Sequence, residues 1–255
     1  MPLTATPTAP AFVTVLVRGL LAGLVAGLLA GVFAYAVGEP HVEAAIAIEE
    51  TAHAEPAAGG HDHEDALVGR DVQRGGLFLA TGLFGAAMGG LLATAYVLLA
   101  RRRRAYDDGR SGLPLAGAAL LGAVVVPFLK YPANPPAVGD PATINQRTVT
   151  YLLMVVLGLV AVWAGSLGYR AVDAGAPSGL RAAAAVGGFL LVTVVSYVVM
   201  PSFQEVPADF PATLLWDFRL ASLGTQVVLW TGTGLLFAAL MQHRHRRATA
   251  AAPAG

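Results

Sequence analysis

The sequence predicts an all-α integral membrane protein. Of its 255 residues, 56% are hydrophobic and only 13% are charged, whereas soluble proteins carry about 25% charged residues. Apolar runs of about 20 residues, the length that crosses a bilayer as a helix, recur along the chain. Cysteine is absent, which excludes disulfides, thiolate metal sites and thiol catalysis.

Six transmembrane helices are predicted, and they cover residues 11–37, 75–100, 111–129, 148–169, 182–200 and 220–241. Only the first contains a charged residue, Arg18, which is close enough to the inner surface to snorkel. The first run is too long for the apolar part of a signal peptide, and no basic segment precedes it. We expect the six helices to form three helical hairpins in a single polytopic membrane domain, residues 1–255.

The first span carries a glycine at every fourth position: Gly19, Gly23, Gly27 and Gly31. This spacing places them on one face of a helix, where the small side chain lets a neighbouring helix approach at backbone distance. Gly85 and Gly89 repeat the spacing in the second span. The pattern predicts a close helix contact in the membrane.

The distribution of arginine predicts the orientation. The connections 101–112 and 170–181, the C-terminal tail and Arg18 together hold eleven of the sixteen basic residues but only three acids. By the positive-inside rule these segments are cytoplasmic. Both the N- and the C-terminus are therefore expected in the cytoplasm, residues 38–74 are expected outside, and the chain is expected to be a multi-pass protein of the plasma (inner) membrane.

The external segment 38–74 is rich in histidine and acidic residues. Its first part, residues 38–71, holds four of the six histidines and nine of the sixteen acids. Imidazole and carboxylate together suit first-row divalent metals, whereas magnesium and calcium sites use oxygen ligands. The candidate metal ligands are His41, His53, His61, His63, Glu39, Glu43 and Glu49. Helical character over 41–55 would place Glu49 and His53 one turn apart; the alternative is a flexible acidic loop that binds any divalent metal loosely.

Polar residues gather at the predicted outer ends of the later spans. The candidates for an outer vestibule or transport path are Lys130, Tyr131, Asn134, Asp140, Arg147, Glu205, Asp217, Arg219, Ser222 and Gln226. The alternative role is helix capping and ion pairing that fixes the loops. Because Lys130, Arg147 and Arg219 repel a cation, we expect the acids to receive metal and the basic residues to hold the acids in place.

Five segments together resemble the CbtA family of predicted cobalt transporter subunits. They are RGLLAG (18–23), GEP (38–40), FLKYPANPPAVGDP (128–141), EVPADFP (205–211) and LLWDFRLASLGTQ (214–226). The resemblance extends from about Arg18 to Met241. It implies a role in cobalt uptake for cobalamin synthesis, often with a small partner, CbtB, that has one span and a histidine-rich end.

We therefore expect a subunit of a cobalt uptake system that captures metal with its external segment and passes it through the helix bundle. The alternative is a metal-responsive sensor or scaffold without its own pore. An enzyme is not expected, because the spans offer no histidine or acid for catalysis. The expected cargo is Co²⁺, with Ni²⁺ or Zn²⁺ as alternatives, and no intrinsic cofactor is expected. The expected partners are the lipid bilayer, a divalent metal ion and a CbtB-like subunit; a homo-oligomer stays open, and no nucleic acid is expected.

Overall fold

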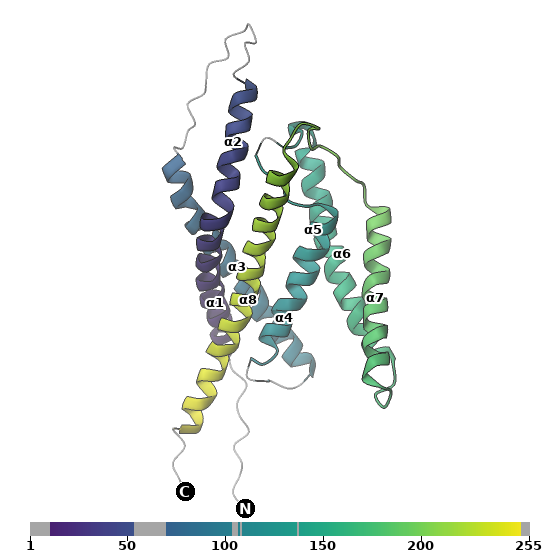
Figure 1. Ribbon diagram of the computed structural model, residues 1–255. Helices are drawn as coiled ribbons and strands as arrows, with labels where there is room; N and C mark the ends of the chain where they lie inside the picture. Colours follow the sequence, from purple (N-terminus) through teal and green to yellow (C-terminus); the bar gives the residue numbers. More distant parts are fainter. Residues whose placement is uncertain (1–10, 54–69, 104–106, 108, 137, 251–255) are drawn as a thin grey trace, which may run out of the picture. The chain divides into compact units, whose positions relative to one another are not determined.

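The computed structural model describes residues 11–53, 70–103, 107, 109–136 and 138–250, and every regular element in them is helical. In chain order these are α1 (Phe12–Phe33), the π-helical turn η1 (Ala34–Gly38), α2 (Glu39–His53), α3 (Arg70–Arg103), α4 (Gly112–Ala119), the π-helical turn η2 (Leu120–Val125), α5 (Val126–Lys130), the 3-10 turn η3 (Pro141–Thr143), α6 (Ile144–Ala171), α7 (Ser178–Val199) and α8 (Ala212–Ala250) (Figure 1).

Six helical segments of the described chain are long and apolar enough to cross a membrane, which confirms the all-α class with six candidate spans. They are Phe12–Thr51, Gly75–Arg103, Gly112–Lys130, Pro141–Ala171, Ser178–Val199 and Ala212–Gln242. Each contains most or all of one apolar run found in the sequence. Most extend beyond it, because a helix continues past the apolar residues into its polar ends.

The first segment differs most from the sequence prediction. Residues 38–53 were expected at the start of an external loop, but α1 continues through η1 and α2 as one helix of 40 residues. The predicted helical character of 41–55 is thus confirmed as far as His53. Proline removes a helix hydrogen bond and crowds the carbonyl four residues before it. Each π-helical turn ends two residues before a proline, η1 before Pro40 and η2 before Pro127, where a wider turn relieves that crowding.

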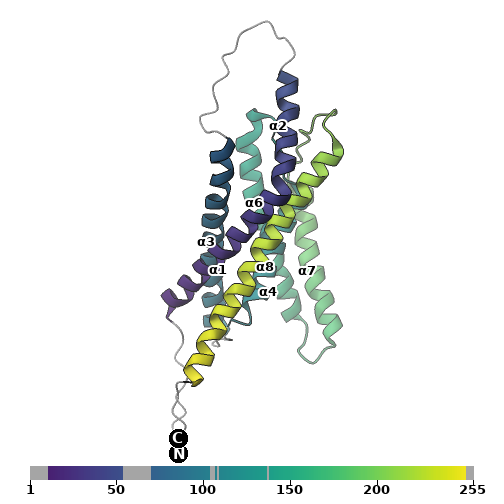
Figure 2. The same cartoon turned by 60° about the vertical axis from the view of Figure 1, so that its left-hand side comes forward.

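The chain forms two compact units, and the first comprises Met1–Val32, Val68–Gly117 and Val228–Gly255. In this unit the glycine stripe of α1 packs directly on α3, as its spacing predicted. A Cβ added to Gly23 would lie 2.9 Å from the Cα of Gly89 and would collide with the carbonyl of Gly85. Contacts on α3 move toward its N-terminus as those on α1 move toward its C-terminus, so the two helices run in opposite directions (Figure 2).

The rest of the first unit is packed around α8. Ala26 and Ala30 of α1 form a buried cluster with Leu229. The ring of Tyr96 on α3 meets the ring of Phe237 edge to face, with 5.3 Å between centroids. The hydroxyl of Tyr96 accepts a hydrogen bond from the backbone N–H of Gly109 at 3.1 Å, so a buried aromatic residue keeps its polar end satisfied.

The second unit comprises Phe33–Leu67 and Ala118–Val227. Here too glycine brings backbones together. A Cβ on Gly158 of α6 would meet the carbonyl of Gly122 in η2, and one on Gly188 of α7 would lie 2.9 Å from the carbonyl oxygen of Ala164. Helices α6 and α7 lie side by side (Figure 1). This packing supports the loop ends that form the cavity described next.

Candidate functional site

The predicted metal ligands divide between α2 and the segment that follows it. Four of them, Glu39, His41, Glu43 and Glu49, lie on α2, and His53 is its last residue. Glu43 is exposed, and the other three of the four are half-buried. Among the described residues no group of three or more His, Asp or Glu side chains could hold a metal ion. His61 and His63 lie outside the described residues.

Six of the ten vestibule candidates line one cavity in the second unit. The cavity has a volume of about 490 Å³, within the usual range for small-ligand sites. The polar candidates on its wall are Lys130, Tyr131, Asn134, Arg147, Glu205 and Arg219. They come from the end of α5, the connection after it, the first turns of α6, the segment before α8, and α8 itself.

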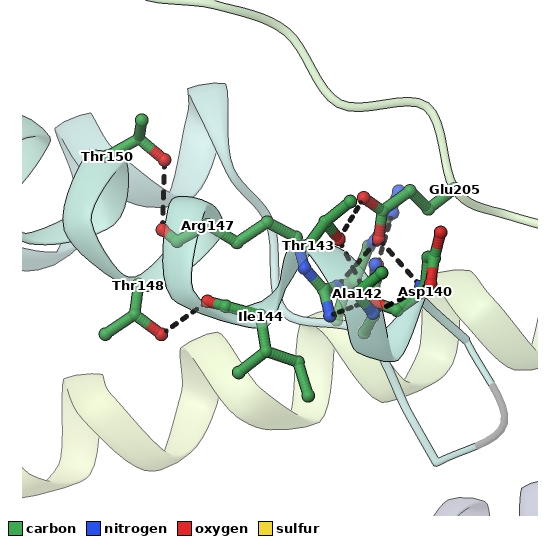
Figure 3. A network of polar contacts seen from close by, with 10 residues as sticks. Asp140, Ala142, Thr143, Ile144, Arg147, Thr148, Thr150 and Glu205 are labelled. Carbon is green, nitrogen blue, oxygen red and sulfur yellow. Dashed lines mark hydrogen bonds and ion pairs between the residues drawn. The ribbon is translucent and has the colours of Figure 1, made fainter.

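Glu205 is the centre of a polar network at one side of this cavity (Figure 3). One carboxylate oxygen accepts a hydrogen bond from the Thr143 hydroxyl at 2.6 Å. The other accepts the backbone N–H of Asp140 and pairs with Arg147, both at 3.0 Å. The Thr143 hydroxyl, the Asp140 N–H and the Arg147 charge together hold the pKa of Glu205 below its usual value. These contacts favour the carboxylate form of Glu205, and each of its oxygens has a partner in the protein.

The backbone of the 138–143 segment is shaped for this network. Gly139 has a φ of +127°, and a Cβ there would lie 3.1 Å from the guanidinium carbon of Arg147. Glycine is favoured at this position both by the backbone conformation and by the close approach. Asp140 then caps η3, since its side chain accepts the N–H of Ala142 at 2.8 Å. The side chain of Asp140 thus stabilises the turn and does not line the cavity.

Two other cations on the cavity wall are held by neutral groups. Lys130 donates to the carbonyl of Tyr197 at 3.1 Å and to the hydroxyl of Ser202 at 2.8 Å. Arg219 donates to the carbonyl of Ala133 at 3.2 Å and to the side-chain oxygen of Asn134 at 2.9 Å. Within the described part of the chain neither cation has a carboxylate partner. Of the three basic candidates, Arg147 alone holds an acid in place there.

The remaining candidates lie on α8, away from the cavity wall. Asp217 is exposed, whereas Ser222 and Gln226 are half-buried on the face that also carries Arg219. The hydroxyl of Ser222 donates to the carbonyl of Phe218 at 2.9 Å, within its own helix. The hydroxyl proton is thus satisfied locally, and the oxygen keeps a lone pair that can accept a hydrogen bond or face a cation.

Sequence reasoning missed the neutral residues that hold two of the charged side chains on the cavity wall. Thr143, Tyr197 and Ser202 fix Glu205 and Lys130, but each lies 62 to 72 residues from the group that it contacts. No local spacing reports such a distant pairing. The one available signal was the proline-rich composition of the connection after α5 and of the connection between α7 and α8. This composition predicts irregular backbone beside the charged residues.

The family model described as "Probable cobalt transporter subunit (CbtA)" matches residues 12–242. No curated protein and no solved structure matches the chain. Because the family match covers nearly all of the chain and its six apolar helices, this protein is a multi-pass protein of the plasma membrane, is not an enzyme, and belongs to the CbtA family of probable cobalt transporter subunits.

Proposed function

We propose that this chain is the membrane subunit through which divalent cobalt enters the cell, and that segment 38–74 captures the metal outside. The observation that carries the proposal is the length of the first helix. Its 40 residues extend over about 60 Å, whereas the hydrocarbon core of a bilayer is about 30 Å thick. The apolar part is α1, so α2 extends beyond the hydrocarbon with its carboxylates and imidazoles.

The proposed topology is three helical hairpins with both termini in the cytoplasm. It is supported by the arginines that follow the apolar part of α3, Arg101 to Arg103, and by those of the C-terminal tail. In this orientation α2 and the cavity of the second unit belong to the external side. The acids of α2 receive the metal, and the polar face of α8 with Ser222 and Gln226 continues the path inward.

The candidate ligands on α2 suit a capture role better than a closed site. Glu39 and Glu43 are one helical turn apart, as are Glu49 and His53. Each such pair offers two ligands from one helix, and a complete coordination sphere needs four to six donors. The pairs therefore bind cobalt weakly and release it, which is what a subunit that raises the local metal concentration requires.

The test compares two variants that each remove histidines. His41, His53, His61 and His63 are changed together to Ala, and the control changes His243 and His245 of the predicted cytoplasmic tail. Initial rates of cobalt accumulation are measured in cells across external concentrations, with the chain alone and with a CbtB-like subunit. The four-histidine variant should lose uptake at trace cobalt and recover at high cobalt, while the control behaves as the parent.

The outcomes separate the proposal from its alternatives. Uptake of trace cobalt at the parental rate by the four-histidine variant contradicts capture by segment 38–74. If the cells take up no cobalt under any condition although the purified chain binds cobalt, the chain is a sensor or scaffold without its own pore. Competition by nickel or zinc in the same assay determines the selectivity among the three metals.

A further inference from the structure

The cavity of the second unit carries an excess of positive charge. Its charged wall residues are Lys130, Arg147, Arg219 and Glu205, which gives a net charge of +2. The single acid is already paired with Arg147 at 3.0 Å. A bare divalent cation is repelled from such a surface, whereas an anion is attracted.

The hydrogen bonds of the two remaining cations point to the same ligand class. Lys130 and Arg219 are each fixed by two neutral acceptors, so they are oriented without being neutralised. Oriented cations with spare donors are the usual means of binding carboxylate or phosphate oxygens.

The other wall residues define the rest of the ligand. Ile144, Tyr151 and Leu152 line the cavity and are 52%, 39% and 58% exposed. These apolar side chains lie in the first turns of α6, at the end of a candidate span. The cavity therefore combines a cationic wall with an apolar edge at the end of a candidate span.

We propose that this cavity is a binding site for an oxyanion, a carboxylate or phosphate group whose oxygens contact Lys130 and Arg219. The group comes either from a small soluble anion or from the headgroup of an anionic lipid. Binding of the anion neutralises the wall beside Glu205. If the proposed function is correct, this neutralisation removes the repulsion that otherwise opposes the entry of cobalt; the binding itself does not depend on that function.

The test measures binding to the purified full-length chain in nanodiscs, without any transport step. In the first arm, inorganic phosphate and citrate are titrated by calorimetry into the protein in phosphatidylcholine nanodiscs. In the second arm, phosphatidylglycerol is added to the nanodisc lipid, and the thermal stability of the protein and the lipid that it retains are measured. Lys130→Gln and Arg219→Gln should each weaken binding about tenfold or more, since each removes a charge-assisted hydrogen bond. The matched control is Arg181→Gln, an arginine of the same unit that stacks on Tyr169 at 4.1 Å.

Loss of folding must be separated from loss of the site, because Arg219 also holds the 133–134 segment. Arg219→Lys keeps the charge and should retain part of the affinity, and melting without ligand reports on folding. Binding of phosphate or citrate identifies a soluble anion. A change in thermal stability or retained lipid with phosphatidylglycerol, but no binding of phosphate or citrate, identifies a lipid headgroup. Either result supports the proposal if Lys130→Gln and Arg219→Gln both lose that binding. The proposal is overturned if no probe binds the parent, or if the glutamine variants bind like the Arg181→Gln control.

Discussion

The contact between α1 and α3 depends on the absence of side chains, and Gly23→Ala tests it directly. The added Cβ would lie 2.9 Å from the Cα of Gly89, whereas carbon atoms pack at about 3.5–4.0 Å. The helices must therefore separate by roughly 1 Å, which forfeits up to about half of the dispersion energy of the contact. Overpacking of this kind costs about 1–3 kcal/mol.

The matched control is Gly117→Ala on α4 of the same unit. An added Cβ there meets nothing within 4 Å among the described residues, so only the helix propensity changes. That change stabilises a helix by up to about 1 kcal/mol. Gly23→Ala gains the same helix propensity, so the two alanine variants should differ by the overpacking alone, about 1–3 kcal/mol in free energy of unfolding, with Gly117→Ala the more stable.

The assay is reversible unfolding in mixed micelles with increasing dodecyl sulfate, followed by circular dichroism. Gly85→Ala, on the opposite helix, should destabilise the protein to a similar extent. The double variant with Gly23→Ala should lose less than the sum, because helices already separated by one methyl group accommodate the second more easily. Equal unfolding free energies for Gly23→Ala and Gly117→Ala would refute the reasoning.

Three further outcomes are expected. Tyr197→Phe removes the 2.6 Å hydrogen bond to the carbonyl of Val126 and should lower the free energy of unfolding by about 1 kcal/mol; an unchanged melting temperature would show that the bond contributes nothing. Because the pKa of Glu205 is lowered, its contacts stabilise the fold fully above the ordinary value of about 4.3 and are lost as the pH falls through the lowered pKa. The melting difference between the parent and Glu205→Gln should therefore be constant near neutrality and shrink only in stronger acid; growth of the difference on acidification would contradict this sign. In the cysteine-free chain, Gly60→Cys should react with an impermeant thiol reagent on intact cells and Ala174→Cys should not; the opposite pattern would invert the proposed topology.

The helices could be predicted from the sequence because the bilayer imposes a single requirement on each. A charge-free run of about 20 residues has few alternatives to a spanning helix, and the glycine spacing in α1 is a local signal of close packing. The same rule predicts an apolar span but does not predict where its helix ends. Gly38 and Pro40 favour an interruption at the start of the external segment, but the π-helical turn before Pro40 lets the helix continue to α2.

The cavity was only partly predictable. Its charged residues could be named, because charges at the ends of apolar spans are conspicuous. Their pairing could not be predicted, because Glu205 and Arg147 are 58 positions apart in the sequence, and such contacts follow from tertiary packing alone. The difference between a paired Arg147 and an Arg219 bound only to neutral acceptors is a property of the folded chain. It determines the chemistry that we propose for the cavity.

The glycine stripe also bears on how α1 and α3 keep their relative register. Because the glycines recur every four residues, α3 could pack against α1 in several nearly equivalent registers, one helical turn apart. The glycines by themselves do not select one of these registers. The selection comes from the ends of the row, where Gly31 meets Thr81 and Gly19 meets Ala93. Sliding by one turn would move each of these side chains from the glycine that it now meets to the next position along α1. We therefore expect a variant with glycine at both positions to select the present register less strongly.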